Sequence, residues 1–144
     1  MNLDLWLTGF IDGEGCFQIE SYSGRLKPSF TIGLAVYDAK VLHEARNALG
    51  HGTVREWLTP PNERPPHVQW VVRSKAGCQA LVDHLHKYPL RTIKHHDFEI
   101  WKQAVELHKC VSTGGDPVSR PSNAATWEQM GQLRVRLMSE RHGA

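Results

Sequence analysis

The chain has 144 residues, of which 40% are hydrophobic and 22% charged, and its formal net charge is +2. This size and composition are typical of one globular domain with a modest core. No apolar run reaches the ~18 residues of a membrane helix, and no basic start with a cleavage site suggests a secretory signal, so we expect no membrane partner. Three cysteines, an odd number without a CxxC pair, favour a reducing intracellular compartment. The small positive charge permits nucleic-acid binding without establishing it.

The predicted elements begin with a helix over residues 4–12, capped by Asn2 or Asp4 and stopped by the glycines that follow. Period-two alternation then predicts strands over about 17–22 and 29–37, which form a hairpin. The remaining elements are a helix over 38–49, strands over 53–58 and 68–73, and helices over 74–87, 96–110 and about 124–141. A proline-rich loop over 59–66 separates the second pair of strands, and a Gly/Ser/Pro linker over 111–122 precedes the last helix.

This order of elements indicates an α+β fold, in which helices cover one face of an antiparallel four-stranded sheet. The opposite face of the sheet is left to solvent or to a partner. We expect a single domain over residues 1–144.

Two carboxylates set between three glycines end the first helix, in the segment LTGFIDGEG that begins at Leu7. A carboxylate at the buried end of an apolar helix is costly unless a metal, a cation or hydrogen bonds meet it. Gly9 and Gly13 are four residues apart and lie on one helical face, where a second helix can approach backbone to backbone. We therefore expect Asp12 and Glu14 to lie where a pair of helices ends.

The segment LTGFIDGEG resembles the LAGLIDADG motif of homing endonucleases. Residues 88–102, YPLRTIKHHDFEIWK, resemble the second signature of the single-motif members of that family. The resemblance covers most of the chain and implies the αββαββα LAGLIDADG homing-endonuclease fold, with a saddle-shaped sheet. It makes Glu14 the metal-binding acid and Lys94 the lysine near the active site, and it leaves Asp12 to cap or hydrogen-bond near the helix junction. The helix pair would meet through Leu5, Thr8, Gly9, Asp12 and Gly13.

The function implied by this resemblance is site-specific cleavage of double-stranded DNA. Divalent metals held by carboxylates neutralise the attacked phosphate and acidify a water, and we expect Mg²⁺ at Glu14 and Gly13. Mn²⁺ should substitute for it, and Ca²⁺ should bind without cleavage. One motif per chain leaves the second acid to a second copy, which predicts a homodimer on a long, near-palindromic site. The product would be a double-strand break with short 3′ overhangs, and the host compartment a bacterial or phage cytoplasm or an organelle matrix.

The uncovered face of the sheet is the expected DNA surface. On composition alone, the polar face of an open sheet is more often merely solvated. The resemblance reverses this interpretation, because the family lays this face along the major groove. The side chains expected there are Gln18, Glu20, Tyr22, Arg25, Lys27, Ser29, Thr31, Thr53, Arg55, Trp57, Gln69 and Arg73.

Two other functions stay open on the same fold. One is an RNA-binding maturase that assists intron splicing, for which Glu14 and Lys94 would be dispensable. The other is a DNA-binding repressor that does not cleave. Dependence on Mg²⁺ distinguishes the endonuclease from the repressor.

Overall fold

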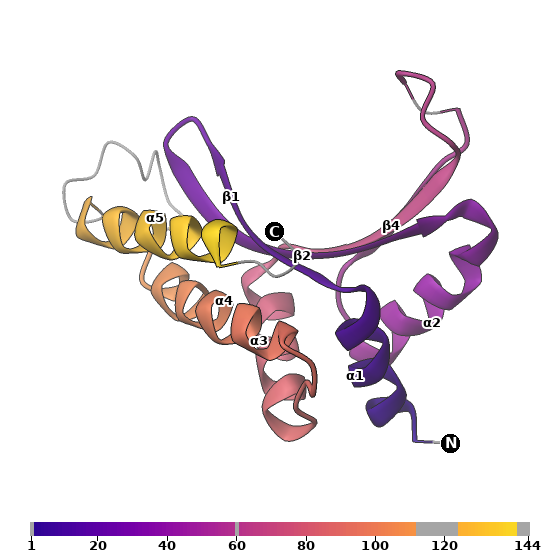
Figure 1. Ribbon diagram of the computed structural model, residues 1–144, viewed down its shortest axis with the longest axis horizontal. Coiled ribbons are helices and arrows are strands. Elements are labelled where there is room, and N and C mark those ends of the chain that lie inside the picture. The colour runs from indigo at the N-terminus through magenta and orange to yellow at the C-terminus, as the bar shows by residue number, and fades with distance from the viewer. Residues whose placement is uncertain (1, 60, 112–123, 141–144) are drawn as a thin grey trace.

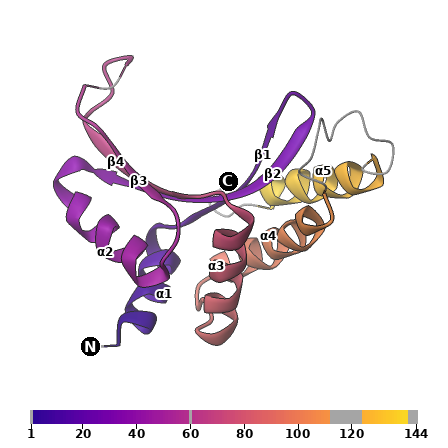
Figure 2. The same cartoon turned by 180° about the vertical axis from the view of Figure 1, so that it is seen from behind.

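The computed structural model describes residues 2–59, 61–111 and 124–140. A four-stranded antiparallel sheet in the order β1-β2-β4-β3 curves into a saddle (Figure 1). The described helices lie beneath its convex side and leave its concave face uncovered, as the view from behind also shows (Figure 2). The predicted α+β class, with helices on one face of an antiparallel sheet, is therefore confirmed. Apart from Val111, the predicted linker lies outside the described residues.

Helix α1 (Leu3–Glu14) begins at Asn2, whose side chain accepts hydrogen bonds from the backbone N–H groups of Asp4 and Leu5. The helix runs through Gly13 to Glu14, two residues beyond the predicted end. Gly13 does not stop it, because glycine still supplies backbone hydrogen-bonding groups to the last turn. The chain turns at Gly15, where an added Cβ would lie 2.7 Å from both the Ile11 carbonyl oxygen and the Phe30 ring.

Strands β1 (Cys16–Tyr22) and β2 (Arg25–Ala35) form the first hairpin, with Phe17 opposite Phe30. The start of β2 lies four residues before the predicted one, although Pro28 lacks an N–H group. The pairing of β2 with β4 extends only as far as Phe30, so the missing donor interrupts no ladder on that side. Strands β3 (Thr53–Trp57) and β4 (His67–Val72) form the second hairpin.

The remaining helices lie close to their predicted ranges and are α2 (Ala39–Leu49), α3 (Lys75–Lys87), α4 (Lys94–Lys109) and α5 (Ala124–Ser139), with a short 3-10 turn η1 (Val36–Asp38) after β2. Helix α4 begins two residues earlier than predicted, and the Thr92 hydroxyl just before it accepts a hydrogen bond from the Lys94 backbone N–H (3.2 Å). Among the described residues, no helix is long and apolar enough to cross a membrane.

The core lies between the convex face and the helices. Its centre is aromatic: the Phe17 ring packs 5.2 Å from Phe30 and 5.1 Å from Trp101, measured between ring centroids. The indole N–H of Trp101 lies within 3.0 Å of the carbonyl oxygens of Gln18 and Ser29 and donates to them. This contact fixes α4 against the hairpin at the point where α1 ends.

Candidate active site

One face of helix α1 packs against the core, and another face is exposed. Leu7 and Ile11 are fully buried, whereas Leu5 is 58% exposed. A Cβ added at Gly9 or Gly13 would meet nothing within 4 Å. Glycine inside a helix costs about 1 kcal/mol relative to alanine, and nothing in the described part of this chain requires it at either position. The open face is therefore shaped for the close approach of another backbone.

The Thr8 side chain does not lie on this open face, and its predicted place in the helix pair is wrong. Thr8 is 6% exposed, and its hydroxyl donates to the Tyr88 carbonyl oxygen (2.8 Å). The hydroxyl oxygen also lies 3.1 Å from Nε2 of His84, which must then be the donor. Burial lowers the pKa of His84, in keeping with a neutral ring. Since successive residues are about 100° apart around a helix, Thr8 faces α3 while Gly9 faces outward.

The Asp12 carboxylate joins the end of α1 to the segment before α4. It accepts hydrogen bonds from the backbone N–H groups of Arg91 (2.8 Å) and Thr92 (3.1 Å) and from the Thr92 hydroxyl. Burial opposes ionisation of Asp12, but these hydrogen bonds and the charge of Lys94 outweigh it and lower its pKa. Asp12 is therefore engaged within its own chain. Its predicted place in the helix pair stays a prediction.

Glu14 and Lys94 lie at the two sides of this junction. The Lys94 ammonium lies 3.4 Å from the Ile11 carbonyl oxygen in the last turn of α1. The Glu14 side chain is exposed, and within the described part of the chain its carboxylate accepts no hydrogen bond. A hollow of about 200 Å³ beside them is lined by Gly15, Cys16, Phe17, Thr92, Ile93, Lys94 and Asp97.

The described part of the chain holds no cluster of three metal-ligating side chains. In residues 2–59, 61–111 and 124–140 no three His, Cys, Asp or Glu side chains lie close enough to hold an ion. Glu14 nevertheless suits a cation, since it is an unengaged carboxylate next to the last carbonyl groups of α1. Helix carbonyls at that end lack intrahelical partners and carry partial negative charge.

The concave face carries an aromatic and cationic cluster at its β3–β4 end. Trp57 lies half-buried, with its ring stacked on His67 at 4.8 Å between centroids and 16° between planes. The Arg55 guanidinium lies over the same ring at 4.8 Å. His67 was missed because β4 was expected to begin at residue 68, although alternation from Gln69 would have placed it on this face.

Of the other side chains expected on the concave face, one is buried, two bind each other and one is not described. Ser29 is fully buried, so its predicted DNA contact is wrong. Glu20 and Arg73 form a salt bridge with each other (3.0 Å). Tyr22 ends β1, and its side chain lies outside the described structure. The register of the strands places Gln18, Glu20, Arg25, Lys27, Thr31, Thr53, Arg55, Trp57 and Gln69 on this face, and their contacts with DNA stay predictions.

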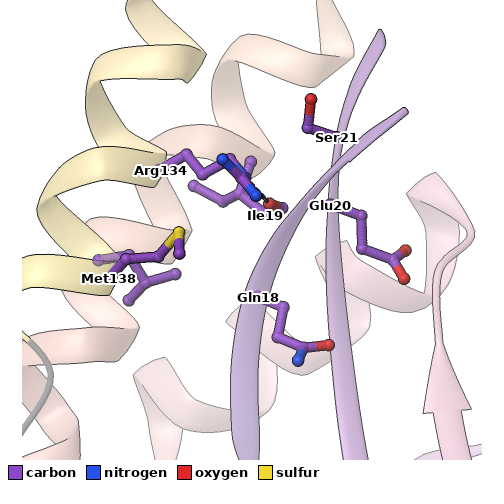
Figure 3. Close-up of a pocket in the computed structure, with 7 residues that line it drawn as sticks. Gln18, Ile19, Glu20, Ser21, Arg134 and Met138 are labelled. Carbon is purple, nitrogen blue, oxygen red and sulfur yellow. Dashed lines mark hydrogen bonds between the residues drawn. The ribbon is translucent and has the colours of Figure 1, made fainter. Parts of the chain in front are cut away.

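A larger hollow, of about 440 Å³, lies between the outer edge of β1 and α5 (Figure 3). Arg134 reaches across it and donates to the Ile19 carbonyl oxygen (2.9 Å), a group on the unpaired edge of the sheet. Gln18 and Glu20 project from β1 away from α5 in the same view, toward the concave side.

Comparison with known families matches residues 7–105 to the LAGLIDADG endonuclease family. A probable intron-encoded endonuclease, Cox1-I1b of Schizosaccharomyces pombe, is 29% identical over 104 residues, which are 69% of this chain and 26% of that protein. The crystal structure of the LAGLIDADG meganuclease I-AabMI bound to uncleaved DNA is 29% identical, with a TM-score of 0.74 over 93% of this chain and 44% of that one. The archaeal intron-encoded homing endonuclease I-Vdi141I, complexed with DNA, shares the fold at 20% identity, with a TM-score of 0.75 over 99% of this chain and 86% of that one. The chain thus spans about a quarter of its curated relative and under half of the first of these structures.

Proposed function

The chain belongs to the LAGLIDADG endonuclease family, and from that membership we propose that it is a Mg²⁺-dependent homing endonuclease. It would act as a homodimer that cuts both strands of a long, near-palindromic DNA site. The observation that carries the proposal is the end of α1, where the exposed Glu14 carboxylate has no hydrogen-bond partner among the described residues and lies at the edge of an open glycine face.

Glu14, with the backbone carbonyl of Gly13, would hold the metal. Magnesium prefers oxygen ligands and keeps several waters, so one or two carboxylates and a phosphate oxygen suffice. The bound ion would supply charge neutralisation at the phosphate and an acidified water. Mn²⁺ would replace it, and Ca²⁺ would support binding without cleavage.

The second acid would come from a second copy of the chain. Leu5, Gly9 and Gly13 would form the contact, since they lie exposed on one side of α1. A two-fold axis between paired α1 helices would bring two Glu14 side chains together at the same end of the pair. Each carboxylate would then serve the cleavage of one strand.

Lys94 would act on the phosphate. Its ammonium is held at the end of α1 by the Ile11 carbonyl, so it can steady negative charge or orient a water without first being ordered. Asp12 would not touch the DNA. It would fix Lys94 relative to Glu14 through Thr92, whose hydroxyl donates to Asp12 and accepts from the Lys94 N–H.

The concave face would lie in the major groove, with Arg55 and Lys27 among its phosphate or base contacts. The compartment would be reducing, a cytoplasm or an organelle matrix. Three unpaired cysteines accord with this, and burial raises the pKa of Cys78 to about 12, which keeps it unreactive.

The test is cleavage of a randomised duplex library by the wild-type protein, with Mg²⁺ or Ca²⁺, followed by sequencing of the ends. The expected result is a near-palindromic set of sites, cut only with Mg²⁺ and carrying short 3′ overhangs. Enrichment of bound duplexes without cleavage in either ion would favour the repressor. Absence of both cleavage and enrichment would remove DNA as the substrate and direct the test to structured intron RNA.

A further inference from the structure

An acidic side chain lies on the surface that is proposed to bind a polyanion. Glu20 projects from β1 toward the concave side, where phosphate groups would repel it (Figure 3). Its partner is Arg73, which follows β4 on the far side of β2.

Glu20 and Arg73 are joined by two hydrogen bonds. Nε of Arg73 lies 3.0 Å from one carboxylate oxygen of Glu20, and Nη2 lies 3.1 Å from the other. Two parallel N–H···O bonds fix the plane of the guanidinium as well as its position. The bridge crosses β2 beside Ser29, whose fully buried hydroxyl has no hydrogen-bond partner among the described residues. An arginine braced in this way has lost much of its rotamer freedom before any ligand arrives.

The bracing uses the side edge of the guanidinium, formed by Nε and Nη2. The end edge, formed by Nη1 and Nη2, points away from Glu20 and carries the pair of N–H groups that suits the O6 and N7 acceptors of guanine. The Arg73 side chain is 53% exposed. Phosphate contact does not require a fixed guanidinium plane, whereas recognition of two acceptors on one base edge does.

We propose that Glu20 is a positioning residue that orients Arg73 to read a guanine in the major groove, once in each half-site of the DNA. This inference rests on the proposed function. Glu20 would therefore lower affinity for DNA in general and raise discrimination at one base pair. Substitution of a phosphate-binding residue, in contrast, changes affinity for all DNA sequences by a similar factor.

The experiment is site selection from a randomised duplex library with Ca²⁺, together with affinities for a selected and an unrelated duplex. The variants are Glu20→Gln, Arg73→Lys and, as a control, Glu56→Gln. Glu56 is exposed on β3 and alternates with Arg55 and Trp57, so it lies on the opposite face and its change removes the same charge. Since a surface ion pair is worth little to stability, all three variants should melt close to the wild type.

The wild type should show one strong guanine preference per half-site that disappears in Arg73→Lys, a loss of roughly 5- to 150-fold in discrimination. Glu20→Gln should weaken the same preference by at least about fivefold while it binds the unrelated duplex more tightly than Glu56→Gln does. An unchanged guanine preference in Glu20→Gln would overturn the bracing role. Intact selection in Arg73→Lys at every position would overturn base reading by Arg73. No enriched duplex with the wild type would overturn the proposed function and this inference with it.

Discussion

Replacing Thr92 with valine should slow cleavage of bound DNA, although Thr92 itself would touch neither the metal nor the phosphate. The substitution keeps the shape of the side chain and removes its hydroxyl. Two hydrogen bonds are lost, one to the Asp12 carboxylate and one from the Lys94 backbone N–H. The bonds from the backbone N–H groups of Arg91 and Thr92 to Asp12 remain, so the junction is loosened rather than opened.

The stability cost can be estimated from these two bonds. A hydrogen bond to a charged group contributes about 1.5–3 kcal/mol and one between neutral groups about 1 kcal/mol. Because Thr92 is exposed, water can hydrogen-bond to the Asp12 carboxylate and the Lys94 N–H in its place and recover part of the lost energy. We therefore expect a loss of about 2 kcal/mol in the free energy of unfolding. For a chain of this size that lowers Tm by roughly 6–8 °C. A shift of Lys94 by about 1 Å would cost roughly 10- to 100-fold in cleavage rate.

The assay is single-turnover cleavage of a selected duplex well below Tm, with affinity measured separately in Ca²⁺. Thr92→Ser, which keeps the hydroxyl, is the matched control and should cleave near the wild-type rate. Thr92→Val should bind normally and cleave slowly. Equal cleavage rates for Thr92→Val and the wild type would refute the coupling of Asp12 to Lys94 through this hydroxyl. An equal loss of cleavage rate in Thr92→Val and Thr92→Ser would refute it as well.

Three further results are expected. Gly9→Leu should leave the monomer folded, because a Cβ added there meets nothing within 4 Å among the described residues. It should abolish self-association in sedimentation, and a dimer of wild-type affinity would place the contact elsewhere. His108→Gln should shift the midpoint of acid unfolding to lower pH. Burial, with the charges of Lys75 and Lys27, lowers the pKa of His108 to about 4, so the wild type loses stability as pH falls from about 6.5 toward 4. An unchanged midpoint would contradict this. Arg55→Ala should weaken binding to all duplexes. It should also lower the slope of log affinity against log salt concentration by about the value of one phosphate contact, and an unaltered slope would exclude a phosphate contact at this residue.

The parts of this fold that the sequence predicts are those governed by neighbours along the chain. Alternation placed Phe30 and Ile32 inside and Thr31 outside, because a strand turns successive side chains to opposite faces. The apolar stripe of α1 and its two-glycine face follow from the helical period in the same way.

The parts that could not be predicted depend on contacts between distant segments. Asp12 meets Thr92, 80 residues later, and no local pattern shows which carboxylate of the motif is engaged within the chain and which is left for a metal. Glu20 and Arg73, 53 residues apart, meet across β2. Ser29 is fully buried, although alternation alone places it on an open face. Such pairings are set by strand order and register, which periodicity does not determine.

The most direct test of the account is the effect of Glu14→Gln on cleavage and on binding of the same selected duplex. The substitution removes the charge and keeps the size of the side chain, so the fold and the DNA surface should be unaffected. We expect undiminished affinity in Ca²⁺ and a fall in Mg²⁺-dependent cleavage on the order of a thousandfold or more, several kcal/mol of lost transition-state stabilisation. Cleavage at the wild-type rate by Glu14→Gln would contradict the assignment of the active site to the end of α1.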